Sequence, residues 1–131
     1  MKKEQKLIRV ATYNDVVGIL SKVCNCRKKF YKLENKYKIK VDNNKYKVFL
    51  LKGLECVCCC LKGSFLAVEK YEGTKGEVYH LNLYAIDDGG NEVLMTQDHI
   101  IPKSMTGSNH IDNLQTMCIN CNGLKGDDIN F

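Results

Sequence analysis

Two pairs of cysteines constrain the fold of this chain more than any other feature of its sequence. Cys56 and Cys59 form the first pair and Cys118 and Cys121 the second, and each pair has two residues between its members. This gap lets both sulfurs of a pair turn toward one ion, and two pairs complete a tetrahedral set of four thiolates. The spacing therefore predicts a structural Zn²⁺ site that ties the middle of the chain to its carboxy-terminal end. Buried apolar thiols are the alternative use of these residues.

The other four cysteines lack this spacing and are expected to be ordinary thiols. They are Cys24, Cys26, Cys58 and Cys60. We expect a cytoplasmic protein, because a reducing environment makes metal binding a better use of cysteine than disulfides. No stretch approaches the roughly 20 apolar residues of a membrane span. The apolar patch near the start is interrupted by Arg9, Asn14 and Asp15, so it does not resemble a secretory leader.

Charge divides the chain into two unequal parts. Residues 1–52 hold 15 Lys or Arg against 4 acidic residues, a net charge of +11, whereas residues 53–131 hold 5 against 11, a net charge of −6. A basic segment with tyrosines among its lysines is typical of a surface that contacts a polyanion. We therefore expect a basic DNA-binding segment over residues 1–52 and the chemistry in residues 53–131. A solvated surface is the alternative for the basic segment.

The basic segment is expected to contain a short helix and a β-hairpin. The helix would begin at a cap, Thr12 or Asn14, and continue to about Lys22. The two strands of the hairpin would be residues 37–41 and 45–51, since both alternate apolar and polar residues around a polar turn.

Residues 53–131 are expected to contain strands followed by one short helix, which makes the whole chain α+β. The turn sequence DDGGN separates two of the strands, and Pro102 ends the strand that follows this turn. The expected strands are residues 65–71, 78–86, 92–96 and 113–118, and the expected helix is residues 118–126.

The most specific motif of the chain lies in this last part. Residues 98–126 read DHIIPKSMTGSNHIDNLQTMCINCNGLKG, which resembles the motif of the HNH endonucleases. The upstream cysteine pair is similar to that of the zinc-bearing, phage-type members, so the expected location is the host cytoplasm if the protein is phage-encoded. The resemblance implies a small, zinc-stapled ββα-metal fold and a metal-dependent enzyme that hydrolyses DNA to a 5′ phosphate and a 3′ hydroxyl. His99, Asn113 and Asn122 correspond to the three positions that name the motif, which makes this an H-N-N variant.

The residue types of this motif fit the hydrolysis of a phosphodiester bond. His99 is the expected general base, because histidine titrates near neutral pH, and Asn113 is expected to hold it in position across the loop. Asp98 and Asn122 offer oxygen ligands to one catalytic cation, and such ligands favour Mg²⁺ or Mn²⁺. The candidate phosphate contacts are Lys103, His110 and Lys125.

The expected partner is therefore DNA, in its double-stranded form, and no membrane. Two alternatives remain open. A zinc-knuckle DNA-binding module without catalysis would explain the cysteines and the basic segment, but not Asp98, His99 and Asn122 together. An RNA-directed nuclease would share all of these residues. The sequence does not indicate an oligomeric state.

Overall fold

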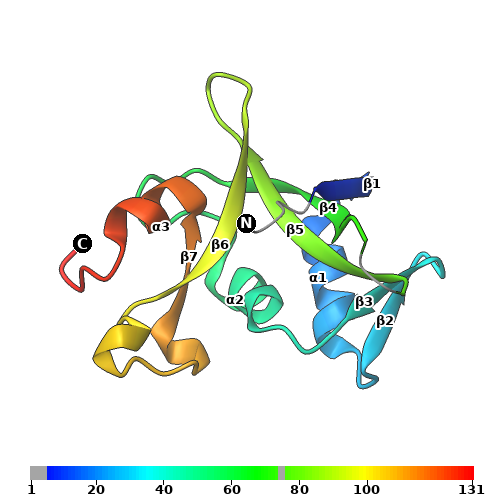
Figure 1. Ribbon diagram of the computed structural model, residues 1–131, viewed down its shortest axis with the longest axis horizontal. Coiled ribbons are helices and arrows are strands. Elements are labelled where there is room, and N and C mark those ends of the chain that lie inside the picture. The colour runs from blue at the N-terminus through cyan, green and yellow to red at the C-terminus, as the bar shows by residue number, and fades with distance from the viewer. Residues whose placement is uncertain (1–5, 74–75) are drawn as a thin grey trace.

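The computed structural model describes residues 6–73 and 76–131 of the chain. In this part of the chain, seven strands form one sheet and three helices pack around it (Figure 1). The strands are β1 (Leu7–Tyr13), β2 (Phe30–Leu33), β3 (Tyr37–Lys40), β4 (Gly63–Tyr71), β5 (Val78–Ile86), β6 (Glu92–His99) and β7 (Leu114–Cys118). The helices are α1 (Val16–Asn25), α2 (Asn44–Lys52) and α3 (Ile119–Lys125), together with the short 3₁₀ turns η1 (Lys103–Met105) and η2 (Ile111–Asn113).

The sheet forks at β5. β4 is antiparallel to β5, and β1 continues the sheet beyond β4. β3 runs parallel to the start of β5, at Val78 and Tyr79, whereas β6 is antiparallel to its end, at residues 84–86. Between these two pairings, the backbone N–H of Leu81 donates to the hydroxyl of Tyr46 from α2 at 3.1 Å. The β2–β3 ribbon and the β6–β7 ribbon therefore diverge from β5, with α2 between them (Figure 1).

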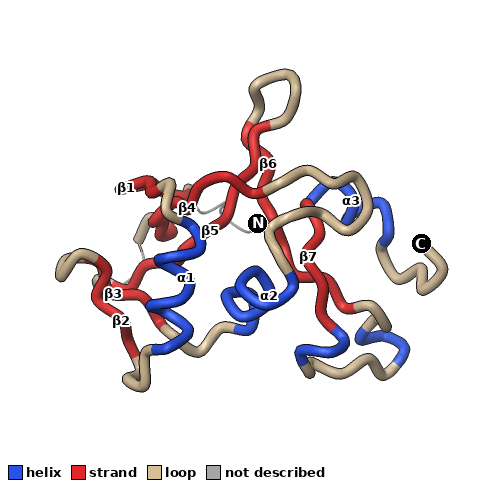
Figure 2. The backbone as a smooth tube through the Cα atoms, turned by 180° about the vertical axis from the view of Figure 1, so that it is seen from behind, coloured by secondary structure: helices blue, strands red, loops and turns tan. Residues whose placement is uncertain are grey.

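The main hydrophobic core lies between the sheet and the helices α1 and α2 (Figure 2). The buried residues of α1 recur at the spacing of a single helix face, which is the pattern of a helix packed against a core. They are Val16, Ile19, Leu20 and Val23. These residues belong to one apolar cluster with the inward side chains of the sheet, among them Leu66, Val68, Leu81 and Leu83.

The expected short helix is present as α1, but its cap differs from the one that the sequence suggested. Asp15 caps it by accepting a hydrogen bond from the N–H of Gly18 at 3.1 Å, in place of Thr12 or Asn14. None of the helices in the described part of the chain has the length and apolar character needed to cross a membrane.

The prediction of a second hairpin strand over residues 45–51 is wrong, because these residues lie within the helix α2. Asn43 caps this helix by accepting from the N–H of Lys45 at 3.0 Å. Tyr46 and Phe49 lie about one turn apart and are both buried. Alternation along these residues resembled a strand, but α2 also buries Val48, on nearly the opposite side from Tyr46, because the helix packs against α1 as well as against β6 and β7.

A β-hairpin does occur in the basic segment, one element earlier than expected. β3 pairs with β2, and the two strands are joined by Glu34, Asn35 and Lys36. Glu34 and Asn35 have positive φ, 51° and 55° respectively, and the turn is closed by a hydrogen bond from the N–H of Lys36 to the carbonyl of Leu33 at 2.9 Å. The turn contains no glycine, so its strongest sequence signal is missing.

The boundary expected near Gly53 does not separate two structural units. β1 and β3 from the basic segment pair with β4 and β5 from the rest of the chain. α2 also lies against β6 and β7. Asn44, at the start of α2, donates to the backbone carbonyl of Asn109 in the β6–β7 loop at 3.3 Å. The net charge does change near residue 52, but strands from both sides of this position pair in one sheet. The basic segment also supports the loop that follows β6.

An ion-pair network ties β1 to the start of β6. The guanidinium of Arg9 donates to the buried carboxylate of Glu69 at 3.0 Å and to both oxygens of Glu92 at 2.9 and 2.8 Å. Glu69 also accepts from the hydroxyl of Tyr84 at 2.6 Å, so its buried charge is paired and hydrogen-bonded. Because Glu92 is the first residue of β6, this network fixes the start of the strand that ends at His99.

Candidate functional site

The loop between β6 and β7 is closed by the side chain of Asn113. Its amide nitrogen donates to the backbone carbonyls of Ile101 and Ser108 at 3.1 and 2.8 Å. Its side-chain oxygen accepts from the N–H of Ile101 at 2.9 Å. This bonding across the loop is the arrangement that the sequence suggested for Asn113, and it holds the segment that immediately follows His99.

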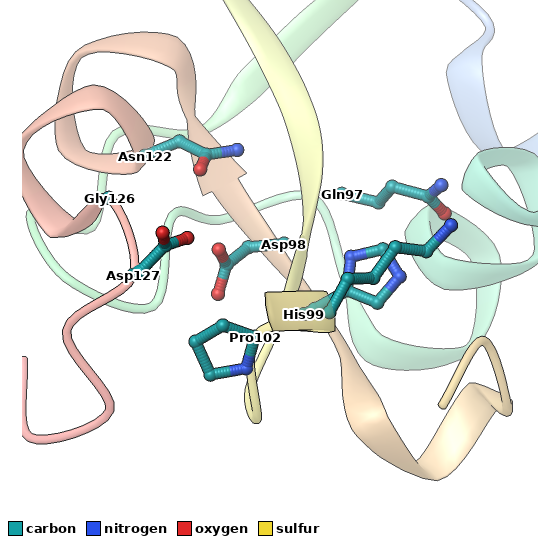
Figure 3. A pocket seen from close by; sticks show the side chains of 8 residues that line it. Gln97, Asp98, His99, Pro102, Asn122, Gly126 and Asp127 are labelled. Atoms are coloured by element: carbon teal, nitrogen blue, oxygen red, sulfur yellow. The ribbon is translucent and has the colours of Figure 1, made fainter. Parts of the chain in front are cut away.

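A cavity of about 280 Å³ opens where the end of β6 faces α3. It is lined by Gln97, Asp98, His99, Pro102, Lys103, Asn122, Gly126 and Asp127. Figure 3 shows Asp98, Asn122 and Asp127 on one side of β6 and the ring of His99 on the other, as expected for adjacent strand residues. Asp98, His99 and Asn122, three of the four residues to which the sequence assigned a catalytic or metal-binding role, therefore line one pocket. The fourth, Asn113, lies outside its lining and acts through the loop.

Asp98 is buried and forms an ion pair with Lys125 of α3. The ammonium of Lys125 lies 3.0 Å from Oδ2 of Asp98 and donates to the backbone carbonyl of His99 at 2.8 Å. The amide of Gln115 donates to the same Oδ2 at 3.0 Å. The side chains of Lys125 and Asp98 are only 4% and 6% exposed. The phosphate contact expected for Lys125 stays a prediction; in this structure its ammonium faces inward and ties α3 to the end of β6.

The ring of His99 is held by Asn109, a residue that the sequence analysis did not identify. Nε2 of His99 lies 2.8 Å from the side-chain oxygen of Asn109 in the β6–β7 loop. An amide oxygen only accepts hydrogen bonds, so Nε2 donates and carries the ring proton. In the neutral ring, Nδ1 is then the nitrogen that can accept a proton.

Asn122 is oriented by a short chain of hydrogen bonds. The hydroxyl of Thr96 donates to the backbone carbonyl of Met117 at 2.7 Å, and it accepts from the side-chain nitrogen of Asn122 at 2.8 Å. With the nitrogen fixed in this way, the side-chain oxygen of Asn122 points toward Asp98 (Figure 3).

Asp127 and Gln97 are further pocket residues that sequence analysis missed. Asp127 follows α3 directly after Gly126, whose φ of 50° turns the chain, and its carboxylate faces that of Asp98 (Figure 3). The only sequence signal for it is an acidic residue immediately after the motif. The Oε1 atom of Gln97 is buried and has no hydrogen-bond partner among the described residues.

The two other candidate phosphate contacts lie at the surface of the loop. Lys103 is exposed in η1 and lines the pocket. His110 precedes η2, where its Nδ1 accepts from the N–H of Asp112 at 3.2 Å, and its side chain is 67% exposed. Phosphate binding by Lys103 and His110 stays a prediction.

The pocket lies within a segment that matches a known family. Comparison with protein-family models gave a match to the HNH endonuclease family over residues 88–130. Residues 88–130 are thus similar to an HNH endonuclease domain, and this segment is called the HNH domain below. Comparisons with curated proteins and with solved structures gave no match. The HNH domain spans β6, β7 and α3 and contains every residue that lines the pocket. Residues 1–87 lie outside the match.

The HNH domain supplies two of four cysteines whose sulfurs cluster. The four are Cys56, Cys59, Cys118 and Cys121, and their sulfur atoms all lie within 4.8 Å of one another. The sulfurs of Cys59 and Cys118 are 3.8 Å apart, which is close to the separation in a tetrahedral site with Zn–S bonds of about 2.3 Å. The grouping predicted from the spacing is confirmed. Cys58 and Cys60 are exposed and do not belong to this set.

Two thiols of this cluster, those of Cys118 and Cys121, resist ionisation unless a cation is bound. Burial raises the pKa of Cys118 and of Cys121, and neighbouring sulfurs raise both further. For Cys56, burial also acts upward, but hydrogen bonds from nearby backbone N–H groups outweigh it and bring the pKa to about 7. Four thiolates this close repel one another, and a divalent cation removes that repulsion. The donor set beside the HNH domain thus fits Zn²⁺.

Proposed function

We propose that the chain is a metal-dependent endonuclease that hydrolyses phosphodiester bonds of double-stranded DNA in the pocket of its HNH domain. One observation carries the proposal. An imidazole held through Nε2 lines the same pocket as carboxylate and amide oxygens. Phosphodiester hydrolysis needs a group that accepts a proton from water and a positive charge at the phosphate. The imidazole can accept the proton, and the carboxylate and amide oxygens can bind a cation. A DNA-binding module without catalysis would leave the set without a role.

His99 acts as the general base in this proposal, with Nδ1 accepting the proton of the attacking water. Asn109 fixes the tautomer and the orientation of the ring before substrate binds, which lowers the cost of reaching the reactive geometry. Asn113 is a positioning residue, because it closes the loop that carries Asn109.

Asp98 and Asn122 would hold the catalytic cation, and Asp127 would offer a third oxygen. Carboxylate and amide oxygens are the donors that Mg²⁺ and Mn²⁺ prefer. When bound, the cation supplies Lewis-acid stabilisation of the scissile phosphate and of the leaving oxygen. The chain's own contribution is to fix the ligand atoms. Lys125 holds Asp98, and Thr96 directs the oxygen of Asn122 into the pocket.

The four clustered cysteines would hold a structural Zn²⁺ that takes no part in the reaction. They join the turn before β4 to the end of β7 and the start of α3. Because α3 carries Asn122 and Lys125, a zinc at this position would keep the pocket assembled.

Incubation of supercoiled plasmid with the zinc-loaded protein tests this function. We expect nicked or linear DNA when Mg²⁺ or Mn²⁺ is present, with ends that DNA ligase rejoins because they carry a 5′ phosphate and a 3′ hydroxyl. Single-stranded RNA is incubated in parallel. Failure to cut either nucleic acid with either cation would refute the proposal, and cleavage of RNA alone would assign the site to RNA.

An Asn109→Ala variant should cleave about 10- to 100-fold more slowly than wild type, because the ring of His99 loses the partner that orients it. The measurement is the single-turnover nicking rate. Asn109→Asp keeps an acceptor oxygen at the same position and serves as the matched control, so it should retain more of the rate. Equal rates for Asn109→Ala and wild type would show that the hydrogen bond does not position the base.

A further inference from the structure

The β2–β3 ribbon carries a face of lysines that have no acidic partner. Its register places Lys32 directly opposite Lys38, and Phe30 opposite Lys40. Because side chains alternate along a strand, these four lie on the face opposite to that of the buried Leu33. All three lysines are exposed, and none forms an ion pair within the described residues.

The pairing of Lys32 with Lys38 is unfavourable in the protein alone, since like charges directly opposite each other on a sheet repel. The ammonium of Lys38 lies 4.2 Å from the ring centroid of Phe30, and this cation–π contact leaves both positive charges in place. Glu34 at the turn is already bonded to the hydroxyl of Tyr13 at 2.9 Å. A surface that maintains this repulsion is complementary to an anionic partner.

The ribbon and the β6–β7 loop beside the proposed active site lie at opposite ends of the molecule. Figures 1 and 2 show α2 between them, with the β6–β7 loop pointing downward and the turn of the β2–β3 ribbon pointing outward. A rod-shaped polyanion that spans α2 would meet the ribbon at one end and the loop beside the pocket at the other.

We propose that the β2–β3 ribbon enters the major groove of duplex DNA while the pocket binds a phosphate farther along the same duplex. This inference rests on the proposed function and narrows its substrate to B-form duplex DNA. The major groove of B-DNA is about 12 Å wide and admits a two-stranded β-ribbon. The major groove of an RNA helix is deep and narrow, and side chains cannot enter it to read the bases. The ribbon lysines then neutralise phosphates along the groove walls.

The first test is a salt titration of duplex binding in the His99→Ala background, which prevents cleavage. The ribbon variant replaces the exposed ribbon lysines: Lys32→Ser, Lys38→Ser and Lys40→Ser. The control variant removes the same charge from exposed lysines outside the ribbon: Lys22→Ser, Lys52→Ser and Lys62→Ser. Each lost phosphate contact flattens the slope of log affinity against log salt by about 0.9, so the ribbon variant should lose about 2 to 3 units of slope.

The control variant should keep a slope close to that of the parent, provided that zinc content and melting temperature are unchanged in both variants. Equal slopes for the ribbon variant and the control variant would overturn the proposal. The salt titration therefore separates groove binding by the ribbon from a general effect of net charge.

The second test identifies the groove and the type of nucleic acid. Duplex DNA, single-stranded DNA and duplex RNA of one sequence are compared, and duplex binding is challenged with methyl green in the major groove or netropsin in the minor groove. We expect preference for duplex DNA and displacement by methyl green, with both effects lost in the ribbon variant. Preference for RNA, or displacement by netropsin alone, would contradict the proposal.

Plasmid nicking by the ribbon variant with His99 restored separates this inference from the proposed function. Slow nicking at low salt and high protein concentration is expected, because the pocket is intact and only binding is weakened. If no form of the protein nicks DNA, the endonuclease is refuted, and duplex binding that depends on the ribbon would still support the ribbon proposal.

Discussion

The His99→Ala variant is expected to cleave DNA at least about 100-fold more slowly than wild type and to bind it with unchanged affinity. The substitution removes the proton acceptor for water, whereas the oxygen ligands of the pocket and the basic surface remain in place. The cleavage measurement is the single-turnover nicking rate at saturating protein. DNA binding is titrated separately without added divalent cation.

His80→Ala is the matched control for this experiment. His80 is exposed on β5, packs against Tyr71 and lies outside the pocket. This variant should cleave at the wild-type rate. Nicking by His99→Ala at the wild-type rate, in a preparation free of contaminating nuclease, would refute the assignment of the general base.

Replacement of Cys118 by serine should release zinc and abolish cooperative folding of the carboxy-terminal half. Cys118 ends β7, accepts from the N–H of Cys121 at the start of α3 at 3.4 Å, and belongs to the sulfur cluster. In small metal-stapled domains, metal binding and folding are one equilibrium, so loss of a ligand removes stability from the fold. Elemental analysis measures the zinc, and circular dichroism during heating measures the unfolding transition.

Cys58→Ser is the comparison, because Cys58 is an exposed neighbour that lies outside the cluster. It should retain its zinc and unfold at the wild-type temperature. Wild-type protein without zinc, or zinc loss on replacement of Cys58 and not of Cys118, would show that the ligand set is wrong.

The HNH domain could be predicted from the sequence because its determinants are local. The strand that ends at His99, the loop after Pro102 and the helix that carries Asn122 each follow from a few neighbouring residues. The two cysteine pairs add one long-range constraint, since four thiolates of this spacing suit a single metal. Family comparison then covers the same segment.

Side-chain partners inside the domain could not be predicted in the same way. Lys125 has the same sequence context whether its ammonium faces solvent or Asp98, and the packing of α3 on β6 decides between the two. Asn109 lies in a polar loop of seemingly equivalent residues, and only the folded loop brings its oxygen to His99. Asp127 reaches the pocket through the turn at Gly126.

In the basic segment, the predicted strand over residues 45–51 is wrong because the apolar residues there fit both the period of a strand and that of a helix. Tyr46, Val48 and Leu50 alternate as in a strand, whereas Tyr46 and Phe49 fall on one helix face. The cap at Asn43 and the hydrogen bond between Tyr46 and Leu81 favour the helix. The hydrogen bond depends on β5, which lies far along the chain from α2. The parallel pairing of β3 with β5 is equally non-local.

The most direct measurement of the proposed chemistry is the nicking rate of zinc-loaded wild-type protein on supercoiled plasmid, before and after Mg²⁺ is added. Zinc content is determined in the same samples. The oxygen-lined pocket predicts no nicking while zinc alone is bound to the cysteines, and rapid nicking once Mg²⁺ is supplied, with zinc content unchanged. Nicking at the same rate with and without Mg²⁺ would contradict a catalytic cation held by Asp98 and Asn122.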